Sequence, residues 1–165
     1  MNISNRGIEL LKECEGVVIR NRKHVIYDDK TGDPVNTNAP LPRGATIGYG
    51  HLIKPGEDFS DGISETAATE LLRSDIATAE HAVQNNINIP LSQNQFDALV
   101  IFAYNIGAKN FATSTVAKYI NIPNFHSDKY PSLDVAWRAW CKTNGHLSPG
   151  LVQRRDAELK LFHTI

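Results

Sequence analysis

The sequence has few cysteines, and the two it has do not form a pair motif. Cys14 and Cys141 lie far apart in a chain of 165 residues. Neither a zinc knuckle nor a disulfide framework fits this pattern. We therefore expect a reduced protein made in the cytosol, whose fold is stabilised by its core alone.

The chain also lacks a long apolar run and an excess of charge of either sign. Charged residues interrupt its first 15 positions, so we expect no secretory signal there, and no stretch approaches the roughly 18 apolar residues of a membrane span. Its formal net charge is -1, with 41% hydrophobic and 21% charged residues. These numbers predict a globular protein with no signal peptide, no membrane insertion and no nucleic-acid partner.

Signatures of metal, phosphate and serine chemistry are missing as well. The six histidines show no spacing that would pair them as metal ligands, and no phosphate loop or Gly-x-Ser-x-Gly motif occurs. The run DDKTGD at 28–33 resembles a calcium loop only superficially, because the terminal bidentate Glu is absent. We expect no metal and no cofactor.

The pattern of apolar residues predicts an α+β fold that is mostly helical. A helix capped by Ser4 or Asn5 is expected to end at Gly16, and short β-branched segments at 17–19, 25–27 and 45–51 indicate a small antiparallel sheet in the first third. The segment 28–42 is rich in turn-forming residues and is expected to be a long loop.

After residue 63 the apolar period becomes helical. A long helix is expected from Ser64 to about Asn86, followed by a helix opened by the capping box at 92–95 and ended by Gly107. Shorter helices are predicted over 111–120, after Ser132 and from Pro149. All strands are expected in the first third of the chain.

Three short motifs follow one another within the first 51 residues. They are Glu15-Gly16, the triplet YDD at 27–29, and the run TIGYGH at 46–51. Hydrolysis of a glycosidic bond needs one carboxylic acid to protonate the leaving oxygen and a second carboxylate to activate water or attack the sugar. The motifs supply two carboxyl groups next to a glycine-rich strand, which favours a glycosidase.

The order of these motifs resembles the catalytic signature of the phage-type lysozymes (endolysins), glycoside hydrolase family 24. The resemblance continues through SQNQFDAL at 92–99, NIG at 105–107 and the segment 149–158, so it covers nearly the whole chain. It implies a single lysozyme-like domain over 1–165. A small sheet lobe at about 16–60 would be linked by the long helix to a helical lobe at about 64–165 that includes the N-terminal helix.

The resemblance also implies a role for each matching residue. Glu15 takes the place of the general acid, Asp29 that of the carboxylate that stabilises positive charge or activates water, and Thr46 that of the residue holding the attacking water. In this family the reaction inverts the anomeric centre, which requires room for water. The positions matching substrate-binding residues are His51, Leu52, Tyr104, Asn105 and Ser114.

The spacing of the motifs departs from the family. Asp29 follows Glu15 by 14 positions and precedes Thr46 by 17, both longer than is usual. Asp28 therefore competes with Asp29 for the second role, and Asp33 is a weaker candidate. The Tyr-x-Asp register favours Asp29. The extra residues at 30–44 form either a flap over the glycan or an edge loop.

Several residues have a structural as well as a functional interpretation. His51 is either a hydrogen-bonded structural histidine or a substrate contact, while Trp137 and Trp140 are favoured as core residues over a sugar-stacking platform. Arg154 and Arg155 either bind carboxylates of peptidoglycan or form salt bridges with Asp156 or Glu158.

The expected function is that of a muramidase, which hydrolyses the β-1,4 bond between N-acetylmuramic acid and N-acetylglucosamine in bacterial peptidoglycan. The alternatives are a lytic transglycosylase and a non-catalytic peptidoglycan-binding module. We expect a monomer that is made in the cytoplasm of the host bacterium and acts on the cell wall after release. An endolysin exported through a holin is favoured over a prophage remnant or an injected effector with a cognate inhibitor.

Overall fold

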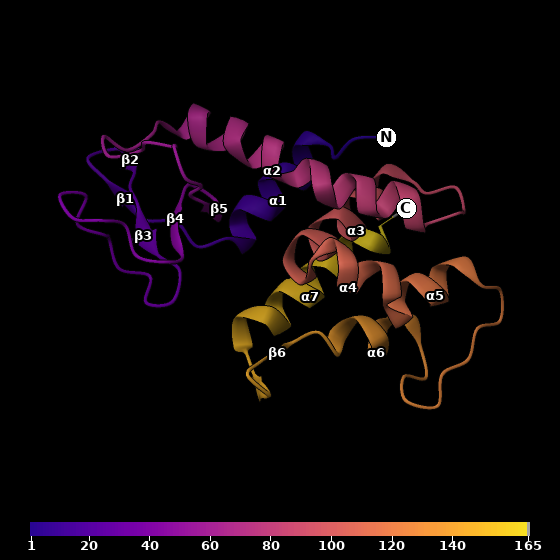
Figure 1. Cartoon of the computed structure of the whole chain (residues 1–165). Helices are drawn as coiled ribbons and strands as arrows, with labels where there is room; N and C mark the ends of the chain where they lie inside the picture. The colour runs from indigo at the N-terminus through magenta and orange to yellow at the C-terminus, as the bar shows by residue number, and fades with distance from the viewer. Residues whose placement is uncertain (165) are drawn as a thin grey trace. The chain divides into compact units, whose positions relative to one another are not determined.

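The computed structural model describes residues 1–164, which are mostly helical with small antiparallel sheets, as the sequence predicts (Figure 1). The helices of the described residues are α1 (Asn5–Cys14), α2 (Glu65–Asn86), α3 (Gln93–Ile106), α4 (Ala108–Thr113), α5 (Thr115–Asn121), α6 (Leu133–Arg138) and α7 (Pro149–Phe162). The strands are β1 (Ile19–Arg20), β2 (Lys23–His24), β3 (Tyr27–Asp28), β4 (Ala45–Ile47), β5 (His51–Leu52), β6 (Lys142–Thr143) and β7 (His146–Leu147).

The chain forms two compact units. The sheet unit is Leu11–Ile76, and the helical unit consists of Met1–Leu10 together with the chain from Ala77 onward. Both α1 and α2 therefore begin in one unit and end in the other. The single-domain organisation expected from the sequence stays a prediction.

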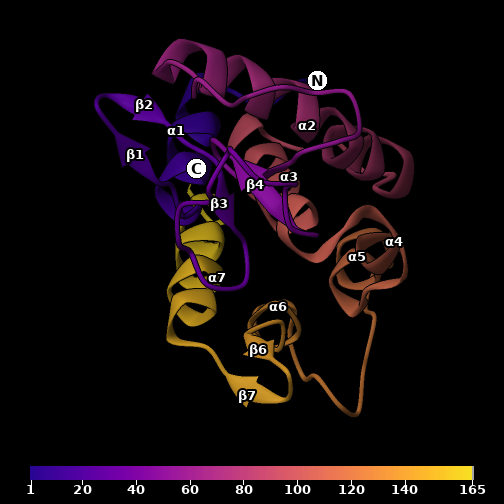
Figure 2. The ribbon, with the colours of Figure 1, turned by 60° about the vertical axis from the view of Figure 1, so that its left-hand side comes forward.

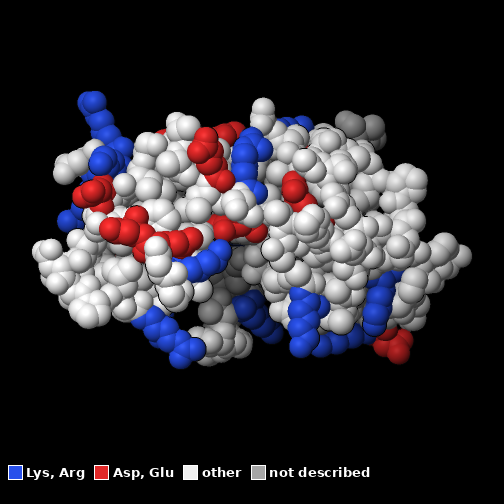
Figure 3. Space-filling view, turned by 45° about the horizontal axis from the view of Figure 1, so that its top comes forward, with Lys and Arg blue, Asp and Glu red and all other residues white. Residues whose placement is uncertain are grey.

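Acidic and basic side chains both occur among uncharged residues on the face drawn in Figure 3. Within residues 1–164, none of the helices combines the length and apolar character that a membrane crossing needs.

The sheet unit contains two small antiparallel sheets. Strands β1 and β2 form a hairpin whose turn residues, Asn21 and Arg22, have positive φ angles of 49° and 62°. Strands β3, β4 and β5 form the second sheet in that order. Tyr27 on β3 lies directly opposite Thr46 on β4.

The segment 45–51 is not one strand, in contrast to the sequence-based expectation. It is β4, a turn at 48–50, and the start of β5, which pairs back onto β4. Gly48 and Gly50 have φ angles of 62° and 91°, which L-residues rarely adopt. The two glycines therefore turn the chain where the alternation of small and apolar residues suggested continuous extension.

The two long helices begin and end close to where their sequence signals indicate. Helix α2 spans Glu65–Asn86, one residue after Ser64, whose hydroxyl accepts the Ala67 N–H. Helix α3 has the complete capping box of Ser92 and Gln95. It ends at Gly107, where a φ angle of 87° gives the backbone a conformation suited to glycine.

The single helix predicted over 111–120 is wrong, because Ser114 divides the segment into α4 and α5. Ser114 has extended backbone angles, and its hydroxyl accepts the Ala117 N–H, as an N-cap does. A serine between Thr113 and Thr115 offers the backbone this alternative hydrogen bond, which competes with a continuous helix.

The expectation that all strands lie in the first third is also wrong. Figure 2 shows the hairpin of β6 and β7 between α6 and α7. Its turn residues are Asn144 and Gly145, with φ angles of 51° and 80°. Asn-Gly is the preferred dipeptide of a two-residue hairpin turn with two positive φ angles, so these two residues by themselves indicated a hairpin.

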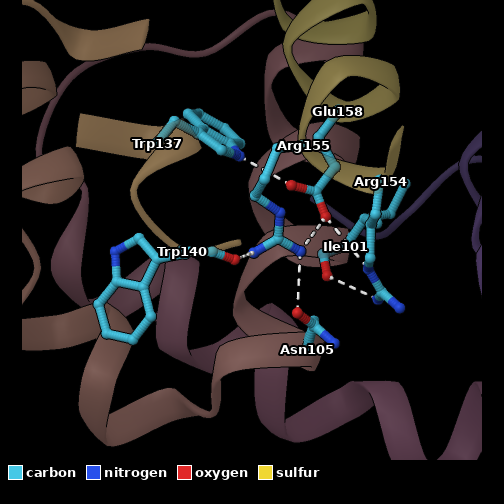
Figure 4. A network of polar contacts seen from close by, with 7 residues as sticks. All are labelled: Ile101, Asn105, Trp137, Trp140, Arg154, Arg155 and Glu158. Atoms are coloured by element: carbon cyan, nitrogen blue, oxygen red, sulfur yellow. Dashed lines mark hydrogen bonds and ion pairs between the residues drawn. The ribbon is translucent and has the colours of Figure 1, made fainter. Parts of the chain in front are cut away.

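The core of the helical unit contains a buried charged group. Figure 4 shows the Glu158 carboxylate between Arg155 and Trp137, with Arg155 Nη2 at 2.8 Å and Trp137 Nε1 at 2.8 Å. Arg154 Nε lies 3.3 Å away on the other side. Arg155 and Glu158 are fully buried, and burial raises the pKa of Glu158 against the opposing charges of the two arginines. Asp156 and Glu158 were the two acidic partners expected for Arg154 and Arg155, and both arginines pair with Glu158.

The surroundings of this group satisfy most of its remaining polar atoms. Arg155 Nη2 also donates to Asn105 Oδ1 at 2.9 Å, and Arg154 Nη2 donates to the Ile101 carbonyl at 3.3 Å. Asp156, the other expected partner, pairs instead with Arg138 at the surface. Trp137 is fully buried and packs on Phe102, with ring centroids 4.7 Å apart, so it is a core residue as favoured.

We predict that Glu158→Gln lowers the free energy of unfolding by about 3 kcal/mol, because it leaves two buried guanidinium groups without their counter-charge. Urea denaturation measures this loss. Asp156→Asn is the matched control on the same helix, where an exposed pair with Arg138 contributes about 0–1 kcal/mol. Equal effects of the two substitutions would show that the buried group is not the stronger interaction.

Candidate active site

The sheet of β3 and β4 has one apolar face and one polar face. Tyr27 pairs with Thr46 and Asp28 with Ala45. Because side chains alternate along a strand, Ile26 shares the face of Ala45 and Ile47, and these three form a buried apolar cluster. The opposite face carries Tyr27 and Thr46, and the same alternation places Asp29 with them.

One backbone carbonyl connects Asp29 with Thr46. The Gly44 carbonyl accepts the Asp29 N–H at 3.3 Å and the Thr46 hydroxyl at 2.9 Å. The first bond continues the ladder of β3 and β4 by one residue. The second commits the hydroxyl hydrogen of Thr46, so that its oxygen presents lone pairs, which can accept a hydrogen bond from water.

Tyr27 lies where the negative charges of Glu15 and Asp29 both act. Its side chain is 7% exposed, and its hydroxyl donates to the Gly16 carbonyl at 3.3 Å. Burial, then the charge of Asp29, then the charge of Glu15 raise the pKa of Tyr27 to about 12. Glu15 and Asp29 therefore both lie within electrostatic reach of the Tyr27 phenol, whose hydroxyl contacts the residue next to Glu15. Glu15 itself follows α1 and is half-buried.

Asp28 is engaged differently from Asp29. Its Oδ1 accepts the Lys30 N–H at 2.8 Å, an Asx turn, and its carbonyl accepts the Gly32 N–H at 2.7 Å. The Asp28 side chain thus closes the turn after β3, on the sheet face opposite to Tyr27. Asp33 contributes its carbonyl to the same turn, by accepting the Asp28 N–H at 2.9 Å.

The enlarged loop returns to the sheet before it reaches β4. Tyr27 forms an isolated antiparallel bridge with Pro34, and the Val35 N–H donates to the Ile26 carbonyl at 2.9 Å. Val35 also packs against the apolar cluster. The first part of the loop is therefore an added edge of the sheet, and residues 36–43 are mostly exposed.

His51 has both ring nitrogens engaged by carboxylates. Nδ1 lies 2.8 Å from Asp75, Nε2 lies 2.9 Å from Glu57, and the residue is 4% exposed. Of the two interpretations of His51, this geometry favours the structural one, since neither nitrogen is available to a sugar. Hydrogen bonds from the Lys54 N–H and from His51 lower the pKa of Glu57. Leu52, the next residue, is 58% exposed on β5.

The three remaining expected binding residues belong to the helical unit. Tyr104 is half-buried near the end of α3, and Asn105 is exposed although its side-chain oxygen accepts a bond from Arg155. Ser114 is buried and lines a pocket of about 320 Å³. Trp140 also lines this pocket, so only its neighbour Trp137 is fully in the core. Their contact with substrate stays a prediction.

Two features of the site were missed by sequence reasoning. The sequence predicts no role for the Tyr27 hydroxyl, although the Tyr-x-Asp spacing places Tyr27 on the same strand face as Asp29. Glu65 gave no motif at all. Its carboxylate binds Lys12, His24 and Tyr49 from three separate segments, and the sequence around Glu65 gives no local signal for these contacts.

Comparison with known proteins finds similar sequences among phage endolysins. A family model described as Phage lysozyme matches residues 26–158. The chain is 37% identical to an endolysin of Bacillus phage B103, covering 99% of this chain and 55% of the relative, and 35% identical to an endolysin of Salmonella phage P22, covering 98% of each. It thus spans little more than half the length of the endolysins of Bacillus phages B103 and PZA.

Two solved structures have a similar fold. A P22 lysozyme mutant superposes with a TM-score of 0.75 at 32% identity over 99% of each chain. The muramidase domain of SpmX from Asticaccaulis excentricus superposes with a TM-score of 0.74, also at 32% identity and over 99% of each chain.

We predict that Asp29→Asn and Glu15→Gln each lower the pKa of Tyr27 from about 12 toward the ordinary value near 10, whereas Asp28→Asn leaves it unchanged. The reason is that each of the first two substitutions removes a negative charge that disfavours the phenolate. Titration of the Tyr27 ring carbon by NMR measures the change.

The raised pKa of Tyr27 also makes the stability of the fold depend on pH. Because the folded-state pKa is raised, the neutral phenol stabilises the fold fully below pH ~10, and this contribution is lost as pH rises toward 12. An equal response of Tyr27 to Asp28→Asn and Asp29→Asn would contradict the assignment of Asp29 to the polar face.

Proposed function

Because the chain belongs to the phage lysozyme family, we propose that it is a muramidase that cleaves the β-1,4 bond between N-acetylmuramic acid and N-acetylglucosamine of bacterial peptidoglycan. The names of its relatives, endolysins and a muramidase domain, support the substrate. The observation that carries the proposal is the arrangement around Tyr27: its hydroxyl binds the carbonyl of Gly16, next to Glu15, while Thr46 and Asp29 share its strand face.

In the proposed reaction Glu15 is the proton donor. Its carboxylic acid gives its proton to the glycosidic oxygen as the bond from that oxygen to the anomeric carbon breaks, so the leaving sugar departs as a neutral alcohol. The electron pair of the broken bond stays on the leaving oxygen, and the anomeric carbon develops positive charge. The carboxylate of Asp29 stabilises that charge.

Thr46 and Asp29 together position and activate the nucleophile, which is a water molecule. Since the Thr46 hydroxyl donates to the Gly44 carbonyl, its oxygen accepts a hydrogen bond from a water molecule and so orients a lone pair of that water away from the strand. The water oxygen bonds to the anomeric carbon, its proton passes to Asp29, and the product is a reducing end of inverted configuration. No cofactor enters this reaction.

Water at Thr46 is also the reason to prefer hydrolysis over transglycosylation. A lytic transglycosylase uses the sugar's own hydroxyl as nucleophile and leaves a 1,6-anhydro end, so a residue that orients water serves no purpose in it. A non-catalytic binding module in turn has no need of the paired carboxylates.

The name endolysin, which several relatives carry, supports a role in lysis of the bacterial cell wall. We propose that the protein acts there as a monomer, after synthesis in the cytoplasm of the host and release through a membrane pore of the holin type. Control by a cognate inhibitor belongs to the alternative setting of an injected effector.

We predict that the wild-type protein releases fragments with new reducing ends from purified peptidoglycan and that Glu15→Gln lowers kcat by about 10³-fold, because the leaving oxygen loses its acid. Mass analysis of the fragments measures the first result, and release of reducing sugar the second. Circular dichroism checks that the variant folds. Anhydro ends would identify a transglycosylase, absence of fragments a binding module, and near-normal activity of Glu15→Gln would exclude Glu15 as the acid.

We predict that Asp29→Asn lowers kcat by about 10²-fold or more, and Asp28→Asn by less than about threefold, since only Asp29 shares the face of Thr46. Asp28→Asn is the matched control, because it makes the same change one residue away and preserves the acceptor of the Asx turn. Steady-state rates on solubilised peptidoglycan decide between the two. A greater loss in Asp28→Asn would assign the second carboxylate to Asp28.

A further inference from the structure

The Glu65 carboxylate lies at the centre of a group of donors from three separate segments of the sheet unit. Its Oε2 accepts a hydrogen bond from His24 Nε2 at 2.7 Å, and its Oε1 accepts from the Tyr49 hydroxyl at 2.7 Å. Lys12 Nζ forms an ion pair with Oε1 at 3.1 Å. Because a carboxylate only accepts, the His24 nitrogen that faces it is the protonated one.

The donors also contact one another. The Lys12 ammonium lies 5.5 Å from the centre of the Tyr49 ring, within the range of a cation–π interaction, and the His24 and Tyr49 rings are 5.2 Å apart. His24 is 1% exposed, and the Lys12 side chain is 14% exposed. Lys12 is thus held on two sides, by the Glu65 charge and by the Tyr49 ring.

The acceptor itself is fixed to the sheet unit. Glu65 is the first residue of α2, and Ile63, two residues before it, pairs with His24 through two backbone hydrogen bonds of 2.9 Å each. Gly62 lies against this bridge, where a side chain at φ 68° would lie 2.7 Å from the His24 carbonyl. The backbone and the ring of His24 therefore both bind the segment that ends at Glu65.

Lys12 connects this group to the proposed acid. It lies in the last turn of α1, and the Glu15 N–H donates to the carbonyls of Leu11 and Lys12 at 3.1 and 3.3 Å. Restraining the Lys12 side chain therefore restrains the helical turn to which the Glu15 backbone is hydrogen-bonded.

We propose that Glu65 is a positioning residue, which holds the last turn of α1 through Lys12 and so fixes Glu15 within the sheet unit. The inference rests on the proposed function, since it takes Glu15 to be the proton donor. Glu65 has no part in the chemistry itself. Its effect reaches the reaction through the position of Glu15.

The energetics of the group predict a separation between stability and rate. The Glu65 side chain is 55% exposed, and solvent-exposed ion pairs contribute little to stability. Displacement of a catalytic group by about 1 Å, in contrast, costs up to about 10²-fold in rate. Although burial alone would raise the pKa of Glu65, the bonds from His24, Tyr49 and Lys12 lower it to about 2, so the charge persists through the neutral range.

The test compares Glu65→Gln with Glu70→Gln, which removes the same charge from an exposed position on the same helix. In Glu65→Gln we expect kcat on peptidoglycan to fall about tenfold with KM within about twofold and an unchanged urea midpoint. The order parameter of the Glu15 amide is expected to fall from about 0.85 toward 0.6. Glu70→Gln should change neither kcat nor the order parameter of the Glu15 amide.

A second set of variants tests the route through Lys12. Lys12→Met should reproduce the loss in kcat, Lys12→Arg should retain most of the activity because it keeps the charge, and the Lys12→Met/Glu65→Gln double variant should be no worse than either single one. Additive losses would overturn the route. An unchanged Glu15 order parameter in Glu65→Gln would overturn the proposal whatever the rate does, as would a mobile Glu15 with unchanged kcat.

The two proposals fail in distinguishable ways. If the wild-type protein releases no fragments from peptidoglycan, the muramidase assignment fails. The order parameter of Glu15 needs no substrate, so it still shows whether Glu65 holds the end of α1.

Discussion

The antiparallel pairing of β3 with β4 is the constraint on which the candidate site depends. With Tyr27 opposite Thr46, one face of the pair carries the apolar residues Ile26 and Ile47 and the other carries the polar groups. A slip of one residue would exchange the faces. It would expose two side chains whose burial is worth roughly 1.5–3 kcal/mol each. Burial of the apolar face therefore determines the register of β3 and β4, and this register places Asp29 and Thr46 on the same face of the sheet.

The burial of a carboxylate decides what it contributes. Glu158 is fully buried between two arginines, where its charge is costly unless every partner is present, so it constrains the fold of the helical unit. Glu65 is 55% exposed and binds a lysine and a buried histidine. Water already solvates its charge, so its bonds add little stability, and what they fix is the relative position of three segments in the sheet unit.

Local sequence signals predicted the fold wherever one residue type determines the backbone. The capping box of Ser92 and Gln95 and the helix end at Gly107 were predicted because each depends on neighbouring residues only. The hairpin turn at Asn144 was equally local, and it was missed because its strands are only two residues long. Ser114 interrupts a helical pattern through its own side chain, which apolar periodicity does not register.

The candidate site likewise has residues that a local sequence motif predicts and contacts that no local motif predicts. Short motifs predict Glu15, Asp29 and Thr46, and the alternation of side chains along β3 explains why Asp29 lies on the same face as Thr46. The contacts of His51 with Asp75 and of Glu65 with Lys12 join residues 24 and 53 positions apart. Such pairs depend on how helices α1 and α2 meet the strands, and a single sequence carries no local signal for them.

The long spacing between Asp29 and Thr46 has a physical explanation in the same pairing. The additional residues leave β3 through the Asp28 turn, return at Pro34 and Val35 as an edge of the sheet, and enter β4 after Gly44. The entropy of closing a loop grows only slowly with its length, so a longer excursion costs little once its ends are paired. Its ends are paired here, since the Gly44 carbonyl accepts the Asp29 N–H. Insertion between the two residues therefore lengthens the loop without moving Asp29 relative to Thr46, and the departure in spacing gives no reason to transfer the second role to Asp28.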